Sequence, residues 1–129
     1  MKHLLDTHTV LWALTEPERL GAKAREIVEA RDTVLVVSAV SAWEIATKQR
    51  LGKLPGADGL IAAYTAHLDR LYVDRLPVHE THALLAGRLQ WEHRDPFDRM
   101  LAAQAMAESM MLVTNDAAFA RLPGLEVLW

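Results

Sequence analysis

The sequence contains no cysteine, so disulfide bonds and thiolate metal ligands have no part in its structure or chemistry. It also lacks an apolar run of about 18 residues, which argues against a transmembrane helix. The first residues do not form a secretory signal, because the apolar stretch that begins at Leu4 ends at Asp6. Of the 129 residues, 51% are hydrophobic and 24% are charged. This composition predicts one folded domain over residues 1–129, in a cytoplasmic protein without membrane association.

The chain has little excess charge of either sign. Its 14 Lys and Arg residues and 17 Asp and Glu residues give a formal net charge of −3. This balance argues against a protein that binds nucleic acid through a broad basic surface. It leaves room for an enzyme that neutralises carboxylates with metal, since without four of its acids the net charge would be +1.

Apolar segments rich in β-branched residues alternate with segments of helical periodicity. Strands are expected at residues 2–5, 33–38, 72–76, 111–114 and 126–128. Helices are expected at residues 9–14, 20–30, 41–51, 59–71, 79–90, 96–109 and 116–121. This alternation predicts an α/β fold whose central, mostly parallel sheet lies between helices. In such sheets ligands bind beyond the carboxyl ends of the strands.

Four acidic residues fall at or near these strand-to-helix junctions: Asp6, Glu44, Asp98 and Asp116. Each could simply be a helix-capping or first-turn residue, which is a common role for an acid at a helix N-terminus. Repulsion makes it costly, however, to gather four carboxylates at one edge of a small domain. Bound Mg²⁺ or Mn²⁺ would remove that cost, because these cations prefer oxygen ligands.

Local patterns support both roles for these acids. Ser41 with Glu44 fits a capping box, and Asp95 is expected to cap the helix that contains Asp98. In that helix Asp98, Ala102 and Ala105 share a face, and the small residues would let the helix approach the sheet closely. A well-packed buried helix needs no active site, so the pattern alone does not decide between the two roles.

Four segments resemble the PIN-domain family: LLDTH at residues 4–8, SAVSAWEI at 38–45, HRDPFDR at 93–99 and LVTND at 112–116. Their order and separation also match, and the resemblance covers residues 2 to about 128. Within the family, the sequence is most similar to the VapC-type toxins of bacterial toxin–antitoxin pairs.

This resemblance implies a three-layer α/β/α sandwich and a Mg²⁺- or Mn²⁺-dependent endoribonuclease. It implies that Asp6, Glu44, Asp98 and Asp116 form a catalytic, metal-binding quartet, with Thr114 as the hydroxyl residue beside the last acid. It also implies an RNA substrate, a cognate antitoxin and a homodimer.

Several other polar residues could contribute to such a site. Lys48 could pair with Glu44 or contact phosphate, and Arg94 and Arg99 are candidates for holding an RNA backbone. His8 and His93 are expected to be polar residues at the rim of the site, with phosphate contacts as the alternative. A separate pair, His79 and His82, lacks a third ligand nearby and is expected to be at the surface or structural rather than a zinc site.

Two tryptophans and one helix face have alternative interpretations. Trp43 is expected in the core, and Trp12 either in the core or in a partner-binding groove. Val10, Leu11 and Leu14 share a face that could be core or could receive the antitoxin.

Other protein classes also begin with a strand followed by an acid. Haloacid-dehalogenase phosphatases need a second Asp two residues later, where this chain has His8. Receiver domains need a Lys after their last strand, and no Lys follows Lys53. A PIN-like module that binds RNA or protein without catalysis remains the alternative, although such modules often lose acids that this chain keeps.

Overall fold

A computed structural model describes all residues from 1 to 129. Five strands form one sheet: β1 (Lys2–Leu5), β2 (Val34–Ser38), β3 (Asp74–Leu76), β4 (Met111–Val113) and β5 (Val127–Leu128). The helices are α1 (Thr7–Thr15), the 3-10 helix η1 (Pro17–Arg19), α2 (Ala22–Glu29), α3 (Ala39–Arg50), α4 (Asp58–Ala62), α5 (Tyr64–Leu71), α6 (Glu80–Arg88), α7 (Pro96–Ala107) and α8 (Ala117–Ala120). None of the helices has the length and apolar character that a membrane crossing requires.

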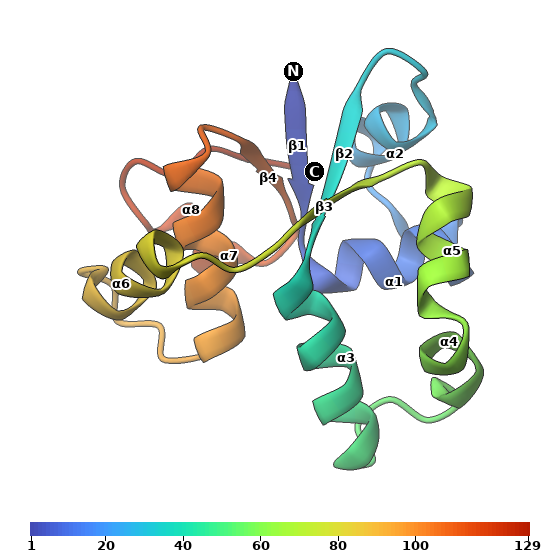
Figure 1. Ribbon diagram of the computed structural model, residues 1–129. Helices are drawn as coiled ribbons and strands as arrows, with labels where there is room; N and C mark the ends of the chain where they lie inside the picture. The colour runs from blue at the N-terminus through green and yellow to red at the C-terminus, as the bar shows by residue number, and fades with distance from the viewer.

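The sheet has the strand order β3-β2-β1-β4-β5, and every neighbouring pair is parallel. Pairing of Leu4 with both Val36 and Leu112 sets the register of the three central strands. Because all strands run in one direction, their carboxyl ends meet at one edge, where α1 and α3 begin (Figure 1). The predicted strands are confirmed, and the sheet is parallel throughout.

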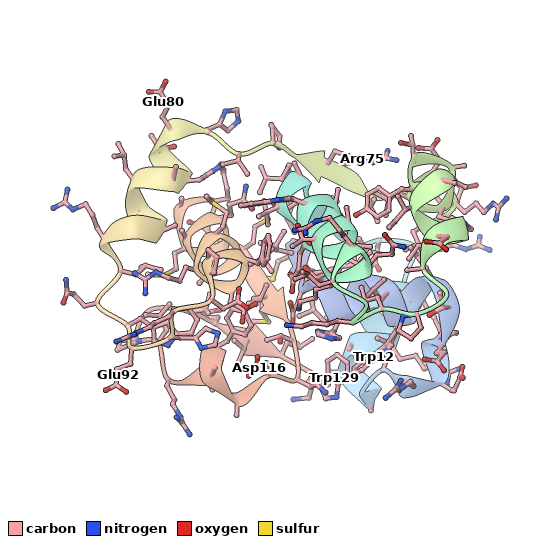
Figure 2. The ribbon with its side chains drawn as sticks, turned by 90° about the horizontal axis from the view of Figure 1, so that it is seen from below. Trp12, Arg75, Glu80, Glu92, Asp116 and Trp129 are labelled. Atoms are coloured by element: carbon pink, nitrogen blue, oxygen red, sulfur yellow. The ribbon has the colours of Figure 1, made fainter.

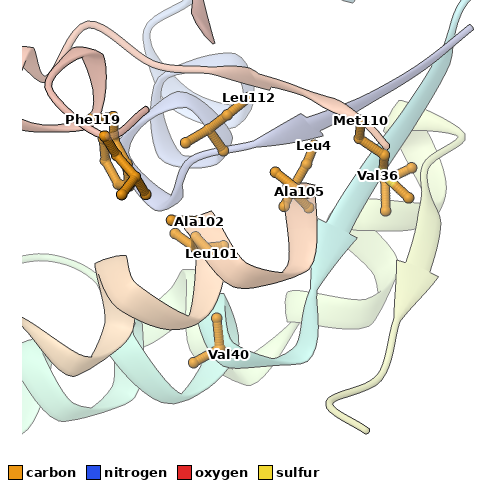
Figure 3. Close-up of a cluster of buried hydrophobic side chains, with 10 residues drawn as sticks. Leu4, Val36, Val40, Leu101, Ala102, Ala105, Met110, Leu112 and Phe119 are labelled. Atoms are coloured by element: carbon orange, nitrogen blue, oxygen red, sulfur yellow. The ribbon is translucent and has the colours of Figure 1, made fainter. Parts of the chain in front are cut away.

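Alternating side chains of the strands supply two hydrophobic cores, one on each face of the sheet. Leu4 and Leu112 pack with residues of α7 and α8 (Figure 3), whereas Leu5 and Val113 pack with residues of α1, α2 and α5. The helices therefore cover both faces (Figure 1), and the predicted three-layer sandwich is confirmed.

Helix α7 lies close against the sheet because its inner face is made of small residues. Ala102 and Ala105 are completely buried and pack in the same core as Leu4 (Figure 3). Asp98 lies one turn before Ala102 on α7, so the close packing fixes the position of this acid relative to the strands.

The helix expected at residues 59–71 is wrong as a single element. It is divided into α4 and α5 at Ala63, whose φ of −118° and ψ of 25° do not continue an α-helix. The break allows Leu68 of α5 to pack into the core of the sheet. Tyr72 ends α5 in a left-handed conformation with φ of 54°, so β3 begins at Asp74 rather than at residue 72.

Candidate active site

Asp6 occupies the junction between β1 and α1, but its side chain does not cap the helix. Instead, its Oδ2 accepts a hydrogen bond of 2.8 Å from Oγ1 of Thr114, which follows β4. Only 4% of Asp6 is exposed. The pKa of Asp6 is raised to about 6, mainly by burial and also by the charge of Glu44, whereas Thr114 and His8 oppose the rise.

Asp98 lies in the first turn of α7, where Asp95 is the capping residue, as predicted. Oδ1 of Asp95 accepts hydrogen bonds from the backbone N–H groups of Phe97 and Asp98, at 2.8 and 3.1 Å. The Asp98 carboxylate is therefore not needed as a cap, and its Oδ2 lies 2.6 Å from Nε2 of His93.

Burial raises the pKa of Asp98 to about 7. The charges of Asp95, Asp6 and Glu44 contribute to this rise, while the hydrogen bond with His93 opposes it. The sequence reasoning placed His93 at the rim of the site and missed this direct contact. Its position five residues before Asp98, across the bend that precedes α7, was the available signal.

Glu44 lies well inside α3, not at its N-terminus, so the predicted capping box is wrong. Ser38 caps α3 by accepting a hydrogen bond of 3.0 Å from the N–H of Val40, whereas Ser41 bonds to the hydroxyl of Thr7 at 2.9 Å. The side chain of Glu44 is 3% exposed, and its Oε2 pairs with Lys48. Its Oε1 is buried without a hydrogen-bond partner. Such an atom is costly, because burial removes water without replacing it.

Lys48 supplies a positive charge beside these acids: it pairs with Glu44, and the charges of Asp95 and Asp98 also act on it. Burial lowers its pKa, but the hydrogen bond and charge of Glu44, with the charges of Asp95 and Asp98, raise it above the ordinary value. Of the two roles considered for Lys48, the i,i+4 ion pair with Glu44 is present in the structure.

Asp116 lies at the same edge of the sheet but uses its carboxylate differently. It is exposed and caps α8, with Oδ1 accepting a hydrogen bond of 2.9 Å from the N–H of Ala118. Its own N–H donates to Oγ1 of Thr114 at 3.1 Å, so Thr114 links Asp116 to Asp6. Figure 2 labels Asp116 in a view from below, onto the end of the molecule where the strands finish.

The structure thus brings three of the four predicted acids into one another's electrostatic field: Asp6, Glu44 and Asp98. Asp116 joins them only through Thr114. No three His, Asp or Glu side chains are arranged so that they could hold one metal ion together. The raised pKa values and the unpartnered oxygen of Glu44 nevertheless mark a shortage of positive charge, which a hard divalent cation with oxygen ligands would fit.

Arg99, a candidate for holding RNA, has a structural role in this chain. Its guanidinium donates four hydrogen bonds of 2.8–3.0 Å to backbone carbonyls, those of Ala86, Leu89, Trp91 and His93. These bonds fix the segment that connects α6 to α7. Arg94 is exposed and makes no side-chain hydrogen bond or ion pair.

Trp43 is exposed rather than in the core, with 60% of its surface accessible. Its ring meets Phe97 edge to face, with the centroids 4.7 Å apart. The two aromatic residues directly precede Glu44 and Asp98, so this pair lies beside the acids.

His82 has a structural role, whereas the side chain of His79 lies at the surface. His82 is 1% exposed, and its Nδ1 accepts a hydrogen bond of 3.1 Å from the N–H of His79. Its Nε2 therefore carries the proton that is shared with Glu108, 2.9 Å away.

The apolar face of α1 divides between core and groove. Val10 is completely buried and Leu14 packs beside it, whereas Leu11 and Trp12 line a groove of about 480 Å³ with residues 54–57 and Leu60. Trp12 packs against Trp129, with ring centroids 5.7 Å apart (Figure 2). The groove is therefore available to a ligand or partner.

Taken together, the fold and site define a parallel α/β domain with buried carboxylates at the carboxyl edge of its sheet. Residues 3–125 match the sequence pattern of the PIN domain family, and the chain belongs to this family. Among curated proteins, none has a sequence that matches the chain significantly.

Solved structures share the fold over nearly the whole chain. One chain of the DNA-bound VapBC from Salmonella typhimurium has a TM-score of 0.75 and 21% identity, covering 99% of this chain and 97% of its own length. One chain of VapBC2 from Rickettsia felis, bound to a promoter DNA fragment, has a TM-score of 0.72 and 20% identity. The match covers 99% of this chain and 98% of that one. One chain of VapBC-5 from Mycobacterium tuberculosis has a TM-score of 0.63 and 19% identity. The match covers 98% of this chain and 97% of that one. At these identities the likeness establishes a common fold.

Proposed function

We propose that this chain is a Mg²⁺- or Mn²⁺-dependent endoribonuclease and the toxin of a toxin–antitoxin pair. The observation that supports catalysis best is the uncompensated negative charge at the carboxyl edge of the sheet. Asp6 and Glu44 are buried there and Asp98 is partly buried, with too few cations and hydrogen-bond donors to neutralise the three acids. Such a cluster of acids is costly to the fold, which is typical of a functional site.

Asp6 and Asp98 would hold the cation directly, with Glu44 and Asp116 completing the site or binding through water. A cation bound there lowers the pKa of water and stabilises negative charge on a phosphate. The residues of the chain prepare the ligands: Thr114 orients the Asp6 carboxylate, and because Asp95 caps α7, the Asp98 carboxylate is not used as the cap. By resemblance to the family, hydrolysis would leave 5′-phosphate and 3′-hydroxyl ends.

The proposed substrate is single-stranded or locally opened RNA. The acids lie at the edge of a small domain whose net charge of −3 argues against a broad basic surface for a duplex backbone. Exposed nucleotides are also easier to recognise than the deep groove of an A-form helix.

The proposed partner is a cognate antitoxin, since the structural neighbours are toxin–antitoxin complexes. The groove of Leu11 and Trp12 is a surface on which a segment of such a partner could lie. We also expect the chain to form a homodimer, by resemblance to the family.

The test of the nuclease function is incubation of the purified chain with total RNA, with and without Mn²⁺. Discrete fragments that require Mn²⁺ and disappear in Asp6→Asn would support the proposal. RNA binding without cleavage under all metal conditions would instead favour a non-catalytic binding module.

A further inference from the structure

A cleft of about 430 Å³ opens beside the candidate active site, between the segment that follows α6 and helix α8. Its lining residues come from these two segments: Gln90, Trp91, Glu92, His93, Ala118 and Arg121. None of them belongs to the acidic quartet, and neither the PIN family match nor the structural neighbours assign them a role.

Two lining residues connect the cleft directly to the acids. His93 lies 2.6 Å from the carboxylate of Asp98, and the N–H of Ala118 donates to the carboxylate of Asp116 at 2.9 Å. A molecule that reaches from the acids into the cleft therefore crosses no intervening element. A single strand with its scissile phosphate at the acids would place an adjacent nucleotide there.

The walls of the cleft are held in place before any ligand binds. Arg99 donates hydrogen bonds of 3.0 Å to the carbonyls of both Trp91 and His93. The ring of Trp91 also packs on Phe119, with centroids 5.6 Å apart, and on His93, with centroids 4.8 Å apart. An aromatic surface that is already fixed loses little entropy when a base stacks on it.

The polar groups of the cleft suit a nucleotide. Arg121 is exposed, and its guanidinium makes no hydrogen bond or ion pair within the chain, so it is free to bind phosphate. The exposed amide of Gln90 can both donate to and accept from a base edge. Glu92 would repel phosphate, which leaves Arg121 as the phosphate end of the cleft.

We propose that this cleft is a nucleotide subsite, in which Trp91 stacks on the base next to the scissile phosphate and Arg121 binds that nucleotide's phosphate. The proposal rests on the nuclease function, because the substrate strand is located by the acids. It names the residues that would select and align RNA rather than cleave it.

The test measures binding apart from cleavage, by fluorescence anisotropy of short labelled single-stranded RNA on the Asp6→Asn protein with Mg²⁺ present. Trp91→Leu in this background should weaken binding roughly 5- to 150-fold, the range expected for one lost stacking contact. Trp91→Phe keeps an aromatic face and should retain most of the affinity. Thermal denaturation of each variant shows whether the fold is intact, since Trp91 also packs against the core.

Arg121→Gln should lower the slope of log affinity against log salt by about 0.7, the value for one phosphate contact with a single strand. Arg31→Gln is the matched control, because it removes the same charge from an exposed position before β2, at the opposite edge of the sheet. It should leave the slope unchanged.

A set of RNAs that each contain one abasic residue locates the stacked base. At the position that occupies the cleft, the missing base should reduce the affinity of the parent protein and erase the difference between the parent and Trp91→Leu. Equal affinities for the parent, a folded Trp91→Leu and Arg121→Gln would overturn the subsite. If the wild-type chain cleaves no RNA under any metal condition but these variants still lose affinity, the binding site is supported and the nuclease function is refuted.

Discussion

Thr114, at the end of β4, donates a hydrogen bond of 2.8 Å to the carboxylate of Asp6, at the end of β1. This contact ties together the carboxyl ends of the two neighbouring strands. It also supplies a neutral donor where the buried carboxylate would be better stabilised by a cation. Asp6 consequently retains a pKa well above that of an ordinary aspartate, at about 6.

The first prediction concerns the pH dependence of stability. The folded pKa of Asp6 is raised, so its contribution to stability is fully present below the unfolded pKa of 3.8 and is lost as the pH rises through about 6. The shift of about two units corresponds to about 3 kcal/mol for this buried group. The raised pKa of Asp98 extends the loss to about pH 7.

Asp6→Asn removes the ionisable group and keeps an oxygen that accepts from Thr114. In metal-free buffer it should therefore be more stable than wild type at about pH 8, with the difference disappearing at about pH 4. Urea unfolding at several pH values in the presence of a chelator measures this. Asp116→Asn, at an exposed position, should leave the pH dependence as in wild type, and identical curves for wild type and Asp6→Asn would contradict the assignment.

The second prediction concerns the cation that the acids lack. Lys48→Met leaves Glu44 buried and unpaired, which should cost about 1–3 kcal/mol in metal-free buffer because Lys48 is partly exposed. Millimolar Mn²⁺ should raise the melting temperature of wild type and raise that of Lys48→Met more, because no ammonium group then competes for Glu44. Differential scanning fluorimetry compares the two. A melting temperature that does not respond to Mn²⁺ in either protein would argue against a metal site.

The third prediction separates two neighbouring arginines. Arg99→Lys cannot reproduce four hydrogen bonds from one guanidinium, so we expect a loss of about 2–4 kcal/mol in unfolding free energy. Arg94→Lys changes an exposed side chain and should be neutral within about 0.5 kcal/mol. Chemical denaturation gives both values, and equal effects would mean that the segment between α6 and α7 does not depend on Arg99.

The fourth prediction compares two acids of one turn. Asp98→Asn should abolish most RNA cleavage with little loss of stability, because the carboxylate caps nothing and its ionisation is unfavourable to the fold. Asp95→Asn keeps an N-capping residue, so cleavage should fall only slightly. Initial rates on one RNA give the ratio. Equal losses would mean that Asp95, not only Asp98, belongs to the catalytic set.

The sequence predicted the layers of this fold because its apolar patterns are local. The alternation along β1 directs Leu4 and Leu5 to opposite cores, and it can be predicted from neighbouring residues alone. The break at Ala63 cannot be predicted from the sequence, because alanine favours helix and only the packing of α5 on the sheet requires the interruption.

The sequence predicted that Asp6, Glu44 and Asp98 lie close together, and the structure places them in one another's electrostatic field. Their role in catalysis stays a prediction. The contacts of the candidate site were not predictable, because they join distant segments. The cap at Ser38 rather than Ser41 moves Glu44 into α3, and a serine pattern fits either choice. The four carbonyl partners of Arg99 belong to a loop whose path depends on the packing of α6 against α7.

The last prediction tests the toxin role in cells. Expression of the chain without a partner should arrest growth, with translation failing before DNA synthesis, because the proposed substrate is RNA used in translation. Asp6→Ala should relieve the arrest, since it removes a carboxylate of the proposed metal site while Thr114 remains. Arg31→Gln, with its charge change at the opposite edge of the sheet, should arrest growth as wild type does. Growth curves and pulse labelling of protein and DNA measure these effects. Arrest that persists in Asp6→Ala would show that toxicity comes from binding rather than cleavage, and normal growth with abundant folded wild-type chain would count against the toxin role.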